Sequence, residues 1–385
     1  MIQIDFKCLV EDQILCDKVQ KAFDGASKII SNTLKLKETI IINATFFDFC
    51  KGQSDLSCPI EVRKIIGATA PNRFYSLKSD DDKLERIYPQ ALVKQFQFPE
   101  HPKYDDYDVS TQFNARVPFY FDDDIIPINP LQYDFQYIVT HELLHGLGFY
   151  TLWRPYQDPL APKGLMPPLV VIDSGNDGNI EPKTFNEPET VKESIFDKFM
   201  IRLDNGTFTS EYSKQIGQYF LDNENVTILN EVEFEQTYQF QLMKEMLGLA
   251  TTPKSLGFLP HDSVNYATDA VILETTLPEF QSGSSLSHVD LLTYNNTKEF
   301  LMVYKGTPGR TLNDFVAIGG NYPGGVIGPK IKSILESIGY ATEDYPNPKK
   351  PNPFVNPKSN SAIPISNSII FNQFYIMIFI IIILL

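Results

Sequence analysis

Two histidines four residues apart, with a glutamate beside the first, are the residues of this chain best suited to chemistry. The sequence reads His141-Glu142-Leu143-Leu144-His145. Residues i and i+4 lie one above the other on a helix, so both imidazoles can direct a ring nitrogen at one metal ion. Zinc lowers the pKa of a bound water toward neutrality, and a neighbouring carboxylate can take its proton. The motif therefore predicts His141 and His145 as zinc (Zn²⁺) ligands and Glu142 as the general base.

The residues around the motif predict the helix that must hold it. Phe135, Ile138 and Val139 recur at helical spacing before the motif, as in a helix packed in a core. Gly146 and Gly148 follow the second histidine, and glycine is common where helices end. We therefore expect a buried helix that ends just after His145.

A catalytic zinc site needs a third protein ligand and one open position. The compact metzincin pattern has a histidine ten residues after the first, but that position is Thr151. His101, His261 and His288 remain, and a downstream carboxylate is a further option. We favour His288 because residues 283–287 before it are mostly small and polar, so its side chain can approach a metal. His261 is the rival third ligand, and no role is expected for His101.

With His288 in place, the chain resembles the leishmanolysin-like metzincins. These carry His-Glu-x-x-His-x-x-Gly-Phe, a long insertion, a third histidine and a methionine turn beneath the metal. Here the insertion would run 143 residues from His145 to His288, and the resemblance covers roughly residues 110–340. It implies that Met302 supports the site from below and that the substrates are proteins or peptides. Tyr304, two residues after Met302, occupies the place where astacin-like metzincins keep a tyrosine that stabilises the oxyanion.

The resemblance also implies an α+β fold of the metzincin-like zincin type. Such a fold has a mixed sheet with the active-site helix in an N-terminal lobe and an irregular C-terminal lobe. We divide the chain accordingly. The parts are an N-terminal lobe with the zinc helix (1–150), an insertion (151–260), a C-terminal lobe with the third ligand and Met-turn (261–342), a flexible stalk (343–367) and a hydrophobic tail (368–385).

Hydrophobic periodicity predicts several elements within these parts. A strand-helix-strand opening is expected over residues 2–9, 13–35 and 39–48. Residues 113–121 look like a strand, and Pro118 suits an edge position, where an extended substrate could pair. Short strands are expected within 198–232, and helices at 234–249 and 329–338.

The cysteines indicate an oxidising compartment. All four fall in the first sixty residues, and none has Cys-x-x-Cys spacing. Three connectivities are possible, and we expect the short-loop pairing of Cys8 with Cys16 and Cys50 with Cys58. The alternative is four buried, reduced cysteines. The leishmanolysin-like metzincins have many more cysteines than this chain.

Sequons agree with a secretory route, although no signal peptide is visible. Asn-x-Ser/Thr triplets begin at Asn43, Asn205, Asn225 and Asn295. Residues 1–6 read as a strand, without the basic and apolar segments of a signal peptide. We therefore expect that the sequence begins downstream of the natural start.

The C-terminus predicts attachment to a membrane surface. Residues 374–385 are an unbroken apolar run of twelve, shorter than the roughly 20 residues of a membrane-spanning helix. Small residues at Asn360-Ser361-Ala362, a short polar spacer and this tail fit a cleaved signal for a glycolipid (GPI) anchor. The competing interpretation is a tail-anchored protein with a cytosolic body, and the sequons and paired cysteines count against it.

Together these features predict a secreted or cell-surface zinc endopeptidase, GPI-anchored, that acts on proteins or peptides. The net charge of −15 counts against nucleic-acid binding, which needs basic surface to displace counterions from phosphates. Two alternatives remain open. One is a surface-anchored binding or adhesion protein on an inactive metalloprotease scaffold. The other is a gluzincin-type peptidase with an acidic third ligand, in which the variant His288→Ala would keep its zinc.

Overall fold

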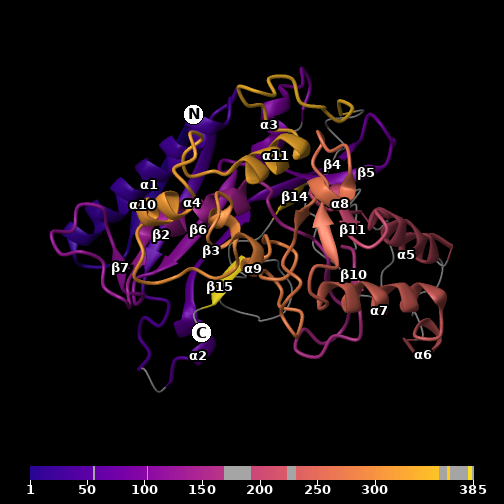
Figure 1. Cartoon of the computed structure of the whole chain (residues 1–385), viewed down its shortest axis with the longest axis horizontal. Coiled ribbons are helices and arrows are strands. Elements are labelled where there is room, and N and C mark those ends of the chain that lie inside the picture. Colours follow the sequence, from indigo (N-terminus) through magenta and orange to yellow (C-terminus); the bar gives the residue numbers. More distant parts are fainter. Residues whose placement is uncertain are drawn as a thin grey trace.

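A strand, a helix and a second strand open the chain and begin its main sheet. The computed structural model describes residues 1–54, 57–101, 103–168, 192–222, 231–354, 362–364 and 380–383. β1 (Ile2–Cys8) and β2 (Ile40–Phe47) pair in parallel, and α1 (Gln13–Thr33) connects them (Figure 1). A parallel pair needs such a crossover, because a short turn cannot return the chain to the same end of the sheet. The predicted opening is confirmed.

The main sheet is mixed, and one edge carries a segment from the other end of the chain. β2 pairs in parallel with β6 (Val109–Asn114), and β6 pairs antiparallel with β3 (Ile65–Pro71). β15 (Ile380–Ile383) pairs antiparallel with β3, which gives the order β1-β2-β6-β3-β15. Figure 1 shows β15 close to β3. The predicted α+β class with a mixed sheet is therefore confirmed.

The run at residues 113–121 is not an edge strand, so that prediction was wrong. β6 ends at Asn114 and lies between β2 and β3, in the interior of the sheet. Pro118 follows a turn and precedes the short β7 (Phe119–Tyr120). Its missing N–H therefore removes no hydrogen bond from the main sheet. β3, rather than this run, borders the last strand.

Two helices cover one face of the sheet and form the main core. α4 (Phe135–Gly146) carries the His-Glu-x-x-His motif and packs against α1, β3 and β6. Phe135 at its start meets Phe23 of α1, Phe46 of β2 and Phe113 of β6, with ring centroids 6.1, 5.8 and 5.2 Å apart. Burial of these rings fixes α4 on the sheet, because large aromatic side chains dominate core packing energies.

The chain beyond α4 is less regular and holds mostly short elements. The elements near α4 are β8 (Tyr133–Asp134), β9 (Arg154–Pro155) and β10 (Leu165–Met166). Next come η1 (Asp197–Phe199), β11 (Met200–Arg202), α5 (Ser210–Asp222), α6 (Glu231–Phe234), α7 (Tyr238–Ala250), β12 (Leu256–Phe258), α8 (Tyr266–Asp269) and β13 (Val271–Ile272). The last are α9 (Leu291–Tyr294), η2 (Phe300–Met302), α10 (Leu312–Ile318) and α11 (Pro329–Ile338).

Two of the helices in this half were predicted, and α5, α6, α8, α9 and α10 were not. α7 and α11 confirm the helices expected at 234–249 and 329–338. Only β11 confirms the short strands expected within 198–232, because residues 210–222 form the helix α5. Figure 1 shows α5, α6 and α7 together at the end of the molecule opposite α1. The predicted divisions of the chain at residues 150, 260 and 342 stay predictions.

The predicted flexible stalk is packed against the body where the structure describes its first part. Phe354 is buried, and its ring meets Tyr75 and Phe98 edge-on at 5.8 and 5.7 Å. The Asn352 amide donates to Lys78 O at 2.7 Å. One aromatic ring thus anchors residues 343–354, although the Pro- and Asn-rich composition suggested a free chain.

That aromatic anchor lies over a hairpin of β4 (Arg73–Lys78) and β5 (Glu85–Pro89), which is followed by α3 (Gln90–Phe96). β14 (Ala362–Pro364) adds to this hairpin by pairing antiparallel with β4. The other residues of the predicted stalk and tail lie outside the described residues, as do Asn360 and Ser361 of the predicted anchor site. In the part of the chain that is described, no helix is long and apolar enough to span a bilayer.

Both predicted disulfides are confirmed. Cys8 joins Cys16 and Cys50 joins Cys58, with Cα atoms 5.9 and 5.7 Å apart, within the usual range for such bonds. Disulfides persist in oxidising compartments, so the pairing supports a protein of the secretory pathway.

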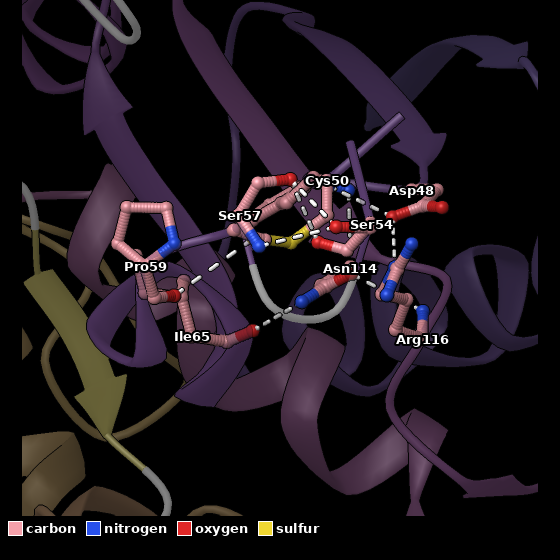
Figure 2. Close-up of a disulfide and its surroundings, with 10 residues drawn as sticks. Asp48, Cys50, Ser54, Ser57, Pro59, Ile65, Asn114 and Arg116 are labelled. Atoms are coloured by element: carbon pink, nitrogen blue, oxygen red, sulfur yellow. Dashed lines mark hydrogen bonds and ion pairs between the residues drawn. A yellow bond between two sulfur atoms is a disulfide. The ribbon is translucent and has the colours of Figure 1, made fainter. Parts of the chain in front are cut away.

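The second disulfide closes the loop that leads from β2 toward β3. Figure 2 shows its surroundings, where Asn114 at the end of β6 donates from its side-chain amide to Ile65 O at 3.0 Å. The carbonyl oxygen of the same side chain accepts from the Arg116 amide at 3.1 Å. Arg116 in turn pairs with Asp48. The start of β3 is therefore fixed by a covalent bridge and by a buried amide.

Candidate metal centre

α4 is held at both ends so that its two histidines reach the interior. At its start, the Asp134 carboxylate accepts from the Tyr137 amide at 2.9 Å and from the Leu312 amide at 2.8 Å. At its end, Gly146 lies so close to β6 that a Cβ there would approach Val109 Cγ1 to 2.4 Å. A larger residue would therefore push the second histidine away from the sheet.

The three predicted histidines converge on one point. Their Nε2 atoms lie 3.0 Å apart for His141 and His145, 3.2 Å for His141 and His288, and 3.2 Å for His145 and His288. All three side chains are fully buried. Among the described residues they form a group that could hold a metal ion.

Each imidazole is oriented by a backbone carbonyl on its far side. Nδ1 of His141 donates to Leu301 O at 2.5 Å, Nδ1 of His145 to Phe149 O at 2.7 Å, and Nδ1 of His288 to Ser284 O at 2.9 Å. A proton on Nδ1 leaves the lone pair of Nε2 free. This arrangement of a ligand nitrogen and an oriented second nitrogen is typical of metal-binding histidines.

Burial keeps these imidazoles neutral, as metal ligands must be. It lowers the pKa of His141 to about 4. Burial and the other histidines hold the pKa of His145 and of His288 well below the usual range. Three lone pairs that face one another without a proton repel, so a cation held between them would stabilise the arrangement.

A zinc ion fits the donor set. Zn–N bonds of about 2.0–2.1 Å in a tetrahedral site place ligand nitrogens about 3.3 Å apart, close to the spacing of the three Nε2 atoms. Imidazole also suits copper, iron and nickel, so the nitrogens alone do not choose the metal. Three protein ligands with no fourth are typical of catalytic rather than structural zinc sites.

Glu142 follows His141 in α4 and carries a buried carboxylate. It is fully buried, and neither oxygen has a hydrogen-bond partner of normal geometry among the described residues. Burial raises the pKa of Glu142 to about 8, and the Thr69 hydroxyl of β3 opposes this shift. A buried carboxylate without partners is expensive, so its presence points to a ligand or reactant that completes it.

His288 comes from a loop, and backbone contacts hold that loop in place. The His288 carbonyl accepts from the Glu274 amide at 2.8 Å, and the following Val289 amide donates to Met302 O at 2.9 Å. The neighbouring Ser287 hydroxyl accepts from the Thr151 amide at 3.2 Å. The segment with Met302 therefore runs beside the third histidine, and its Leu301 carbonyl orients the first.

The chain after α4 turns sharply to supply one of these contacts. Gly148 adopts a φ of +112°, a conformation that L side chains rarely adopt. This turn brings the Phe149 carbonyl to His145 and directs Thr151 to the loop of His288. The Gly-x-Gly that follows the motif thus helps to build the centre.

The remaining predicted residues lie outside the histidine cluster. Tyr304 is half-buried, its pKa is raised by burial, and its hydroxyl has no hydrogen-bond partner among the described residues. Its role, like the support expected from Met302, stays a prediction. His261 contacts Ser337 and Tyr345, and His101 stacks on Tyr104.

The sequence did not point to Thr69 or to the three carbonyls that orient the imidazoles. Backbone carbonyls leave no trace in residue types, so no pattern could have identified them. Of the predicted sequons, Asn205 is exposed in a turn, Asn43 lies in β2 and Asn295 follows α9, whereas Asn225 lies outside the described residues.

The chain belongs to the SPBPB7E8-like family, whose model matches residues 1–363. It is 28% identical over 362 residues to the uncharacterized protein PB7E8.01 of Schizosaccharomyces pombe. That alignment covers 89% of this chain and 63% of the relative, so the chain spans less than two thirds of the relative's length. No solved structure matches. Neither name states an activity.

Proposed function

We propose that this protein is a zinc-dependent endopeptidase with a metzincin-like zincin fold that hydrolyses proteins or peptides outside the cell. The observation that carries the proposal is the combination of three converging Nε2 atoms with a buried Glu142 that follows His141 in α4 and whose carboxylate has no hydrogen-bond partner of normal geometry among the described residues. A structural metal site has no need of such a carboxylate. A hydrolytic site needs a base in this position.

His141, His145 and His288 are the proposed zinc ligands. A zinc ion held there would supply Lewis acidity toward water and toward a peptide carbonyl. Glu142 takes a proton from the attacking water and passes it to the leaving amine nitrogen as the C–N bond breaks. Tyr304 stabilises the oxyanion, and Met302 supports the ligands from the side of η2.

β3 contributes the wall of the site opposite the histidines. Thr69 of β3 lies beside Glu142, and its hydroxyl shares a hydrogen bond of 2.6 Å with Thr111 of β6. Either hydroxyl of this pair can be the donor, and where Thr111 donates, Thr69 keeps its own proton for the Glu142 carboxylate.

The two disulfides support work in an oxidising compartment, and the GPI anchor and the cell-surface location are part of the proposal. The gluzincin alternative loses its main argument, because the third side chain of the cluster is His288 rather than a carboxylate. Nucleic acid is not proposed as a partner.

A second function is favoured by one observation. His141, His145, His288 and Glu142 are all fully buried, which suits a closed metal centre in a surface-anchored binding or adhesion protein. In that case zinc would bind without hydrolysis. The two functions share the metal and differ in the use of Glu142.

The test measures zinc content and casein cleavage for the wild type, Glu142→Gln and His288→Ala, with His261→Ala as a matched control outside the cluster. We expect Glu142→Gln to keep zinc and to lose about 10²- to 10⁴-fold in cleavage rate. His288→Ala should lose zinc, whereas His261→Ala should keep both zinc and cleavage. Equal cleavage by wild type and Glu142→Gln would refute the peptidase. Zinc without any cleavage in the wild type would support the binding protein.

A further inference from the structure

Arg154 lies a few residues beyond the metal helix and has no acidic partner in the part of the chain that the structure describes. It opens β9, which pairs antiparallel with β10, and its register partner is Met166. The side chain is half-buried. Among the described residues it makes neither an ion pair nor a hydrogen bond, and the only effect on its pKa is a lowering by burial.

Four of the other arginines are paired with carboxylates, and the half-buried Arg310 instead donates to Asn296 Oδ1 at 3.2 Å and lies over the Phe315 ring. Arg73 lies 3.5 Å from Asp105, and the corresponding N···O distance is 2.6 Å for Arg86 and Glu193. Arg116 and Arg202 have their own acidic partners. The chain has 48 acidic and 33 basic residues, so carboxylates are abundant enough to pair with every arginine. A half-buried guanidinium that has no carboxylate partner among the described residues is available to a carboxylate of a ligand.

The segment that carries this arginine is tied to the metal centre. The Phe149 carbonyl accepts from His145, and the Thr151 amide donates to Ser287, next to His288. Three residues of extended chain span at most about 10 Å, so Arg154 begins within that distance of Thr151. An extended peptide that reaches the metal centre could therefore also reach the guanidinium within a few residues.

The same short segment offers a second donor without an acceptor. Trp153 is 3% exposed, and its indole N–H has no hydrogen-bond partner among the described residues. Residues 153 and 154, two and three residues after Thr151, thus hold two donors without an acceptor among the described residues. Donors of this kind recognise anions and carbonyl oxygens.

We propose that Arg154 binds a carboxylate of the substrate, so that the enzyme prefers peptides with an acidic group near the scissile bond. The guanidinium presents parallel N–H groups that match both oxygens of a carboxylate. The protein carries a net charge of −15, so acidic peptides gain little elsewhere on its surface and depend on this residue. The acidic group can be a Glu or Asp side chain or a free C-terminus. This inference rests on the proposed peptidase function.

The first experiment compares kcat/KM on zinc-loaded enzyme for peptides that differ only in Glu against Gln at one position. A second pair differs in a free against an amidated C-terminus, which separates the two sources of the carboxylate. We expect a preference of about 10- to 100-fold for the charged member of one pair, since a hydrogen bond to a charged group has that worth. Arg154→Gln should reduce the ratio to about 1, and Arg154→Lys should leave an intermediate ratio.

Arg63→Gln is the matched control, because Arg63 is exposed and the change in net charge is the same. It should keep the preference of the wild type. Wild-type enzyme without any preference would overturn the proposal. So would an Arg154→Gln variant that binds zinc and keeps the preference.

A binding measurement separates this inference from the peptidase proposal. Calorimetry on zinc-loaded Glu142→Gln with the same peptide pairs needs no cleavage. Tighter binding of the charged peptide that disappears with Arg154→Gln supports the carboxylate site even where casein is not cut. Equal binding of charged and neutral peptides, together with normal casein cleavage, refutes the site and leaves the peptidase intact.

Discussion

The helix that carries two of the ligands and the loop that carries the third reach the same point by different means. α4 fixes His141 and His145 through helical geometry, and apolar packing fixes α4. The loop of His288 has no such repeat, and it is held by backbone hydrogen bonds to Glu274 and Met302. A regular element thus supplies the pair, while the irregular half supplies the residue that completes it.

The two regions also differ in what they bury. Around α4 the buried side chains are mainly aromatic and aliphatic. Around the loop, Glu274 is fully buried and its carboxylate accepts from the Thr276 amide at 2.7 Å and the Leu291 amide at 3.0 Å. Hydrogen bonds are directional and apolar contacts are not. The loop should therefore be more sensitive to the loss of one atom, and the helix to the loss of volume.

Phe135→Ala removes a core contact of α4 and should have the largest effect on the free energy of unfolding. The ring is fully buried among aromatic side chains from α1, β2 and β6, so its removal should lower the free energy of unfolding by about 3–5 kcal/mol. Urea unfolding at constant zinc measures it. Leu131→Ala, at a site 74% exposed, is the control and should change stability by less than about 0.5 kcal/mol. A small effect of Phe135→Ala would show that the helix does not depend on this core.

Zinc should stabilise α4 and the His288 loop together, and His288→Ala should abolish this shared stabilisation. A ligand at a thousandfold excess over its Kd stabilises the folded state by about 4 kcal/mol. We expect zinc to raise the melting temperature of the wild type and to protect the amides of both α4 and the His288 loop from hydrogen exchange. His288→Ala should show little of either effect. Protection of α4 alone in the wild type would contradict a shared site.

The titration of Asp197 should make the stability of the segment that contacts the His288 loop depend on pH. It is fully buried, accepts from the Thr151 hydroxyl at 2.6 Å and the Leu152 amide at 3.0 Å, and burial raises its pKa to about 6. The unfolded value is about 3.9, so between these two values the folded state binds more protons and stability falls as pH rises. The fall should total about 3 kcal/mol between pH 4 and 6 and then stop.

Asp197→Asn should lack this fall. Unfolding of metal-free wild type and variant at pH 4, 5, 6 and 7 measures the difference between them. The buried histidines act in the opposite direction in the same pH range, but they are common to both proteins and cancel. Parallel stability curves for the two proteins would show that Asp197 does not titrate as expected.

Asp134→Ala should have the smallest effect on stability, because it removes only two hydrogen bonds, one to α4 and one to α10. One carboxylate oxygen caps α4 and the other accepts from the Leu312 amide at the start of α10. Loss of a helix cap costs about 1 kcal/mol. Thr311→Ala, which removes only the cap of α10, is the comparison in the same unfolding assay. Equal losses in the two variants would indicate that Asp134 does not link the regions.

The parts of the molecule that repeat were predictable, and the parts that depend on distant contacts were not. The spacing of His141 and His145 fixed their common face, and the alternation in β1 and β2 predicted two strands. His288 was identified by its small neighbours and by resemblance, since no periodicity marks a loop residue. The interior position of β6 and the contact of Phe354 with Tyr75 depend on partners elsewhere in the chain, and residue types do not encode those.

The third ligand is 143 positions from the second, and this separation determines the entropy that the chain loses when it closes at the metal site. Closing a loop costs free energy that grows only with the logarithm of its length. A third ligand 143 residues away therefore costs only about 3 kcal/mol more in closure entropy than one six residues away. The helices and strands of the intervening segment can offset this with their own packing. Segments of very different length can thus be exchanged between these two histidines while the geometry of the metal site is kept.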